Sequence, residues 1–200
     1  LVPSACIIPH LGSYNYYAPE LYDPRCGIIQ ALGTKGKNRD LPIVTLVNYA
    51  IHPEVIGSDQ GILSPDLIGP LYDRIEAKAG GMALFMNGAQ GGMVTADNRQ
   101  DNNKEANDWE ECKRIGNLLA DEALRIVSEA EIQEDPQLYC TSTQAEFPID
   151  SEMMRYILNN SPLKMGKSDR SVSTTLNLLN IGSAQILTIP GEALPNIGYY

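Results

Sequence analysis

Hydrophobic and polar residues follow two different periods along this chain, and these periods predict where its strands and helices lie. Short apolar runs rich in β-branched residues predict strands at 26–32, 42–50, 82–86, 137–147, 174–182 and 184–190. Apolar residues at helical spacing predict helices at 67–79, 105–130 and 151–158. Strands and helices alternate in the first half and strands dominate the second. We therefore expect an α/β or α+β fold, with a layered mixed sheet and flanking helices.

The first 24 residues show neither period. They mix Pro, Tyr, Gly and Asn, and this composition predicts an irregular segment laid over a surface formed by residues upstream of it. Leu1 is not a start methionine, and Tyr200 follows soon after a strand-like run. We interpret residues 1–200 as a single incomplete domain, an internal segment of a longer protein.

The composition excludes several classes of protein. With 43% hydrophobic residues among 200, the chain can bury a substantial core. A net charge of -10 argues against a nucleic-acid partner, because binding to phosphates requires a basic face. No apolar run reaches the roughly 18–20 residues of a membrane-spanning helix. The four cysteines lack C-x-x-C spacing, so we expect buried thiols, with a Cys6–Cys26 bridge as the alternative if the protein is exported.

The two histidines limit the metal sites that the chain can form. A site of three histidines cannot be assembled from His10 and His52 alone. His52 lies just beyond the apolar strand 42–50 and is followed by Pro53, a location where a rigid element can direct an imidazole toward a cleft. The alternative is an imidazole that is merely hydrogen-bonded at a strand end. We interpret His10 as a surface residue.

Carboxylates and glycines supply the other candidates. Glu192 follows Pro190-Gly191 at the end of an apolar strand, which suits a metal ligand or base; the alternative is an acidic residue in the first turn of a helix. Asp66 is foremost a helix N-cap and Asp97 a turn residue.

A glycine-rich turn at 88–92 lacks the Lys of a phosphate-binding loop. Backbone N–H groups of Gly91 and Gly92 are candidates for an anion or oxyanion nest. Thr95 follows closely and is a candidate nucleophile or orienting donor, although a lone threonine is usually neither.

Four blocks occur in a distinctive order: NYAIHPEV, LSPDLIG, ALFMNGAQGGMVTADN and ILTIPGEALPNIG. This order resembles the neutral, non-lysosomal ceramidase family, with a pattern that spans residues 23–198. The family hydrolyses the amide of N-acyl sphingosine with one Zn²⁺, bound by two histidines, a glutamate and a tyrosine on an α/β-type catalytic domain. The resemblance implies that His52 is the second histidine ligand and Glu192 the glutamate ligand. The first histidine would precede Leu1, and the tyrosine would follow Tyr200.

The resemblance implies zinc-dependent hydrolysis of a ceramide-like or related N-acyl substrate by an attacking water. Gly91, Gly92 or Thr95 would stabilise the oxyanion, and Thr95 is the nearest match to a family serine. It also implies a secreted, periplasmic or outer-surface location, with peripheral membrane contact for access to substrate. Two alternatives remain. One is a non-catalytic binding or cell-surface module, suggested by threonine in place of serine. The other is another metal-dependent hydrolase, for example one acting on phosphoesters, for which the chain has few ligands.

Overall fold

The structure is a computed structural model of the whole chain that describes residues 2–7, 13–15, 18, 20–99, 104–163 and 170–199. His10 lies outside the described residues. The chain forms two compact units, one made of Leu1–Pro136 with Glu192–Tyr200 and the other of Gln137–Gly191.

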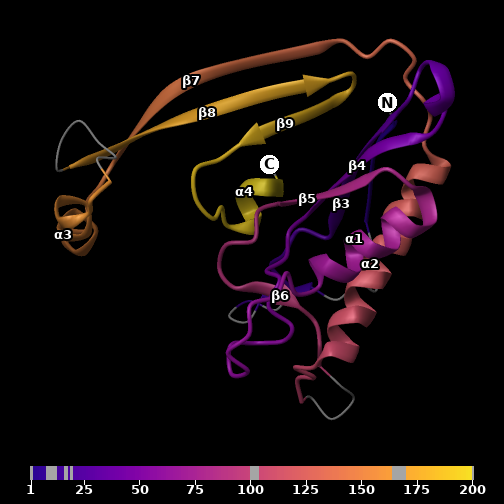
Figure 1. Cartoon of the computed structure of the whole chain (residues 1–200). Helices are drawn as coiled ribbons and strands as arrows, with labels where there is room; N and C mark the ends of the chain where they lie inside the picture. Colours follow the sequence, from indigo (N-terminus) through magenta and orange to yellow (C-terminus); the bar gives the residue numbers. More distant parts are fainter. Residues whose placement is uncertain are drawn as a thin grey trace. The chain divides into compact units, whose positions relative to one another are not determined.

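A four-stranded sheet organises the first unit (Figure 1). Its strands, in spatial order, are β1 (Val2–Ile7), β3 (Arg25–Leu32), β4 (Pro42–Tyr49) and β5 (Met82–Asn87). Strand β3 is antiparallel to both of its neighbours, β1 and β4, whereas β5 is parallel to β4. The crossover between the parallel strands is helix α1 (Ile68–Ala79). The sheet is therefore mixed, as predicted.

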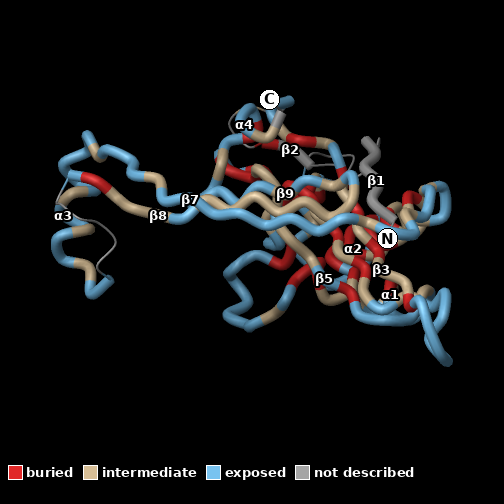
Figure 2. The backbone as a smooth tube through the Cα atoms, turned by 90° about the horizontal axis from the view of Figure 1, so that it is seen from above, coloured by how far each residue is buried: buried red, intermediate tan, exposed pale blue. Residues whose placement is uncertain are grey.

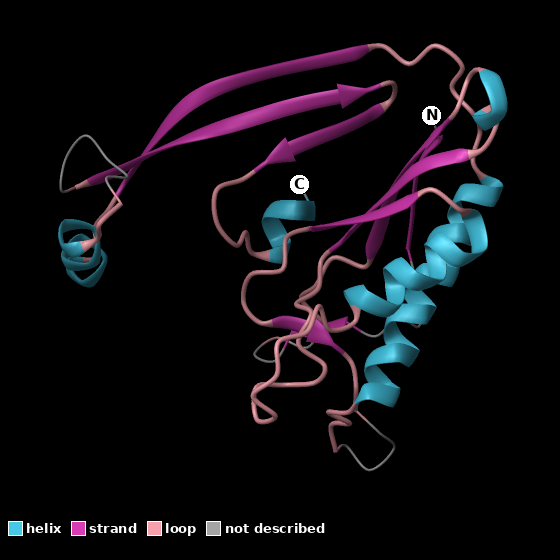
Figure 3. Cartoon of the chain, in the orientation of Figure 1, coloured by secondary structure: helices cyan, strands magenta, loops and turns pink. Residues whose placement is uncertain are grey.

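Alternation along the central strands buries one face of this sheet. Every second residue from Cys26 to Gln30 of β3 and from Thr45 to Tyr49 of β4 is buried: Cys26, Ile28, Gln30, Thr45, Val47 and Tyr49. Helices α1 and α2 (Trp109–Glu129) pack on each other and against the sheet, where the buried positions gather (Figures 2 and 3). The two buried polar residues satisfy each other, because Gln30 Nε2 donates to Thr45 Oγ1 at 2.9 Å. The period read from the sequence thus forms the core.

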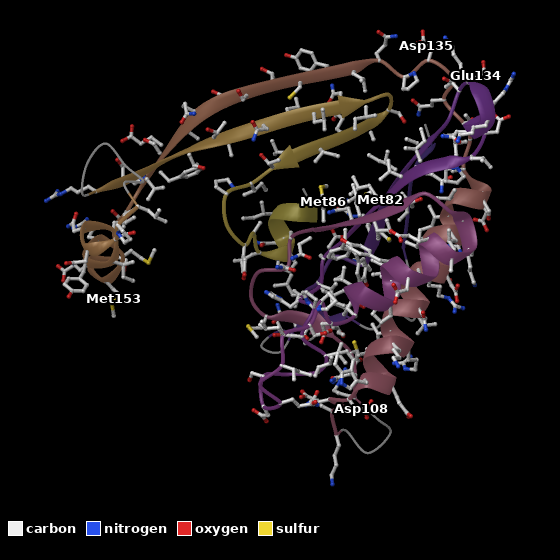
Figure 4. The ribbon with its side chains drawn as sticks, in the orientation of Figure 1. Met82, Met86, Asp108, Glu134, Asp135 and Met153 are labelled. Atoms are coloured by element: carbon white, nitrogen blue, oxygen red, sulfur yellow. The ribbon has the colours of Figure 1, made fainter. Side chains whose placement is uncertain are left out.

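Local sequence determines where α2 begins and how closely it packs. Asp108, labelled at the helix start in Figure 4, accepts a hydrogen bond from the Glu111 N–H at 2.8 Å and so caps the first turn. Further along, a Cβ at Gly116 would overlap the carbonyl oxygen of Leu67. Glycine therefore allows α2 to approach the start of α1.

Short elements complete the first unit. They are β2 (Ser13–Asn15), a 3-10 turn at Gly36–Asn38, β6 (Val94–Ala96) and α4 (Pro195–Tyr199). Strand β2 pairs antiparallel with β6.

The second unit is an antiparallel sheet with a helix in one connection. Its strands, in the order β7, β8, β9, are Leu138–Pro148, Ser171–Ile181 and Ala184–Thr188. Helix α3 (Glu152–Asn160) lies between β7 and β8 in the chain and has no buried residue. Its Met153 is 69% exposed (Figure 4).

The structure confirms the mixed α/β class and the predicted strands and helices after residue 25, with ends shifted by a few residues. The prediction of an irregular segment laid over upstream residues is wrong for 2–7 and 13–15, since β1 pairs with β3 and β2 with β6, both within the chain. Strand formation there depends on distant partners, which leave no local period.

The cysteines divide by environment. Cys26 and Cys112 are buried, as expected, but Cys140 is exposed on β7, which corrects the expectation of buried thiols there. The register of β1 and β3 places Cys6 directly opposite Cys26 in the backbone. Among the described helices, none has the length and apolarity needed to cross a membrane.

Candidate functional site

His52 is held just beyond β4 by a single carbonyl oxygen. Its backbone N–H donates to the Val94 carbonyl at 3.0 Å, and its ring Nδ1 lies 2.7 Å from the same oxygen. Because a carbonyl only accepts, Nδ1 carries a proton, and in the Nδ1–H tautomer the lone pair of the ring lies on Nε2. The side chain is only 17% exposed, so the ring has little freedom to turn.

Glu192 faces that lone pair. Its Oε2 lies 3.5 Å from His52 Nε2, although the two residues are far apart in the sequence. Two electron-pair donors at this separation repel each other unless a proton or a cation lies between them. Zinc ligands about 2.0–2.2 Å from the metal at a tetrahedral angle are about 3.4 Å apart, close to the spacing found here. The pair therefore fits two positions of a zinc site.

The glycine-rich turn at 88–92 packs directly against the segment that contains Glu192. The Gly91 N–H donates to the Ala193 carbonyl at 2.8 Å. A Cβ on Gly91 would lie 2.6 Å from the Glu192 carbonyl oxygen, so any side chain would force the two segments apart. Gly92 adopts a left-handed φ of 79° beside Leu194. The turn thus sets the position of Glu192 through direct backbone contact.

Thr95 lies beside His52. A parallel backbone bridge joins His52 to Thr95, and Thr95 is also paired with Tyr14 of β2. Its side chain is half-buried. The structure therefore brings His52, Glu192, the glycine-rich turn and Thr95 together within the first unit. The Gly91 N–H is engaged by the Ala193 carbonyl, which weakens it as a candidate oxyanion donor.

The two aspartates have different surroundings. Asp97 pairs with Arg99 at 2.6 Å, and this hydrogen bond lowers the pKa of the carboxyl group, with the charge of Arg99 adding to the effect. It is thus a turn residue engaged by its neighbour, as predicted. The N-cap prediction for Asp66 is wrong, because Leu67 occupies the cap position of α1 and Asp66 takes a left-handed φ of 53°.

Sequence reasoning missed two groups that hold the site. One is the Val94 carbonyl, which any residue could supply and for which a sequence therefore contains no signal. The other is the Asp66 carboxylate, which accepts hydrogen bonds from the backbone of Val55 and Ile56. An aspartate directly after Ser64-Pro65 was the only sign of this role in the sequence.

Within the described part of the chain, no group of three or more His, Cys, Asp or Glu residues lies close enough to hold a metal. His52 and Glu192 are the pair in this part of the chain that could hold a metal together with further ligands.

Comparisons with known proteins agree with this architecture. No protein-family model matches the chain, and no curated protein is significantly similar to it. A solved structure of neutral ceramidase from Pseudomonas aeruginosa superimposes with a TM-score of 0.70 at 12% identity, covering 99% of this chain and 41% of that one. A structure described as ceramidase complexed with C2 gives a TM-score of 0.67 at 11% identity, covering 99% and 42%. The chain thus spans less than half the length of these proteins and has the fold of the corresponding part of neutral ceramidase.

Proposed function

We propose that this chain supplies half of a zinc site that hydrolyses the amide bond of an N-acyl sphingoid lipid or a related N-acyl compound. The observation that carries the proposal is the spacing of 3.5 Å between His52 Nε2 and Glu192 Oε2, with the ring proton held on Nδ1. An imidazole oriented through its other nitrogen is the usual arrangement for a metal ligand. The ceramidase-like fold supports the choice of substrate class.

Each residue has a defined task in this proposal. His52 and Glu192 hold the metal, and the Val94 carbonyl keeps the imidazole in the ligating tautomer. When bound, zinc would polarise the amide carbonyl and activate a water. The two remaining ligands lie outside residues 1–200 in this proposal, as the resemblance implies.

The glycine-rich turn and Thr95 act on the substrate. The Gly92 N–H donates to the developing oxyanion, a contribution typically worth about 3–4 kcal/mol for one donor. Thr95, bridged to His52, orients the reacting group through its hydroxyl. A general acid must protonate the departing amine. An exported location and peripheral membrane contact belong to the same proposal, since such a substrate resides in membranes.

The test uses the full-length protein. We expect about one zinc per chain by elemental analysis, together with hydrolysis of N-acyl sphingosine. His52→Ala and Glu192→Ala should each remove metal and activity together. Glu131→Ala, which removes an exposed carboxylate outside the site, is the matched control and should retain both.

The outcomes separate the alternatives. Zinc with no hydrolysis of N-acyl sphingosine, but hydrolysis of another N-acyl compound, would keep the amidase and change the substrate. Absence of zinc from the wild-type protein would contradict the proposal and favour a non-catalytic binding module.

A further inference from the structure

The carboxylate of Asp66 is buried between the loop that follows His52 and the start of α1. The residue is only 5% exposed. Its Oδ1 accepts hydrogen bonds from the N–H groups of Val55 at 3.0 Å and Leu67 at 2.7 Å. Its Oδ2 accepts one from the Ile56 N–H at 2.9 Å. Three backbone donors offset the cost of burying the charge, and their bonds are stronger than those to a neutral acceptor.

An unusual backbone conformation holds this carboxylate in place. Asp66 has a φ of 53°, which costs free energy for a residue with a side chain and persists where surrounding contacts impose it. The Ser64 Oγ accepts a hydrogen bond from the Asp66 N–H at 2.9 Å. The carboxylate therefore reaches back to the loop after His52 as well as contacting Leu67.

The loop that Asp66 holds is short and leads directly from His52. Only Pro53 and Glu54 separate His52 from Val55, so the anchored amides lie three and four residues beyond the imidazole. On its other side, His52 is fixed by the Val94 carbonyl through both its backbone N–H and its ring. The imidazole is thus held between two fixed points, one of which is the Asp66 carboxylate.

We propose that Asp66 is a positioning residue for His52. By tying Val55 and Ile56 to the start of α1, it keeps the His52 ring against the Val94 carbonyl and Nε2 directed at Glu192. This role refines the proposed function, and the zinc measurement described below rests on that function. The ring geometry can be tested without any metal.

Asp66→Asn is the informative substitution. The asparagine side chain keeps one oxygen that can accept from the N–H groups of Val55 and Leu67. Its NH2 group faces the Ile56 N–H, and because both groups are donors, this hydrogen bond is lost. Asp108→Asn is the matched control, because Asp108 also accepts a backbone N–H at a helix start, on α2.

The first readout is the tautomer of His52 in metal-free, full-length protein, measured by long-range ¹H–¹⁵N NMR and assigned with His52→Gln. We expect Nδ1–H alone in the wild type and in Asp108→Asn, and a mixture of Nδ1–H and Nε2–H in Asp66→Asn. The second readout is zinc affinity, which should fall about tenfold in Asp66→Asn and stay within twofold in Asp108→Asn.

An Asp66→Asn protein that keeps the single Nδ1–H tautomer while losing thermal stability would overturn the inference, since Asp66 would then be structural only. If the wild type binds no zinc, the proposed function fails, but the tautomer still tests the positioning role. If Asp66→Asn does not fold, hydrogen exchange of the backbone amides in the wild-type protein tests the inference instead. We expect His52, Val55 and Ile56 to exchange at similar rates, whereas protection of His52 alone would refute the linkage.

Discussion

The carbonyl oxygen of Val94 accepts from His52 twice, at 3.0 Å from the backbone N–H and at 2.7 Å from ring Nδ1. One backbone atom therefore contacts both the main chain of His52 and its ring, and it holds a proton on Nδ1. Val94 lies two residues after the glycine-rich turn, separated from it by Met93. The turn that contacts the Glu192 segment therefore also leads into the residue that orients His52. The two candidate ligands depend on one segment of chain.

Gly91→Ala should separate the two ligands. The added Cβ would lie 2.6 Å from the Glu192 carbonyl oxygen, so the segment that carries Glu192 must move. We expect zinc affinity to fall at least about tenfold, because ligand geometry controls binding. Gly27→Ala is the control, since its Cβ would meet only Asn48, at an ordinary 3.7 Å. Unchanged zinc binding in Gly91→Ala would show that this contact does not position Glu192.

Gly116→Ala should destabilise the first unit. Its Cβ would overlap the Leu67 carbonyl oxygen, so α2 must withdraw from α1 at a cost of about 1–3 kcal/mol. Urea unfolding monitored by circular dichroism measures the change. Lys113→Ala, at an exposed position of the same helix, should change stability by less than about 0.5 kcal/mol. Equal stability of the two variants would contradict close packing at Gly116.

Acid should weaken the link between α1 and α2. Hydrogen bonds from Arg74, and then from Lys78, lower the pKa of Asp121 from 3.8 to about 2. A lowered pKa in the folded state means that the carboxylate contributes stability above pH 3.8, and that this contribution is lost as pH falls from 3.8 through 2. The effect is small, since Asp121 is 40% exposed. Asp121→Asn should reduce the loss of melting temperature over this interval; an unaltered pH profile would mean that the pair contributes nothing.

Two cysteines should differ sharply in reactivity. Burial is the main factor that raises the pKa of Cys112 to about 12, so almost no thiolate forms at pH 8. Cys140 is exposed. Brief treatment of the folded protein with iodoacetamide at pH 8, followed by peptide mass spectrometry, should modify Cys140, whereas Cys112 should react only in denaturant. Rapid labelling of Cys112 under native conditions would show that its surroundings open readily.

Much of the fold could be predicted because hydrophobic periodicity is local. The β3–β4 pair, α1 and α2 follow directly from the spacing of their apolar residues. Strands β1 and β2 could not be predicted, since their pairing depends on β3 and β6, which lie elsewhere in the chain. A segment without a local period can become a strand when a distant edge offers hydrogen bonds.

Residue types and their order along the chain were enough to identify candidates for the chemistry. Two histidines, one of them after a strand, and a Pro-Gly-Glu block made His52 and Glu192 the candidates. The folded chain was needed to show that they face each other at 3.5 Å, that Nδ1 carries a proton, and that Asp66 reaches back to the loop after His52. These relationships are made by backbone N–H and carbonyl groups, which almost every residue has, so side-chain identity cannot reveal them in advance.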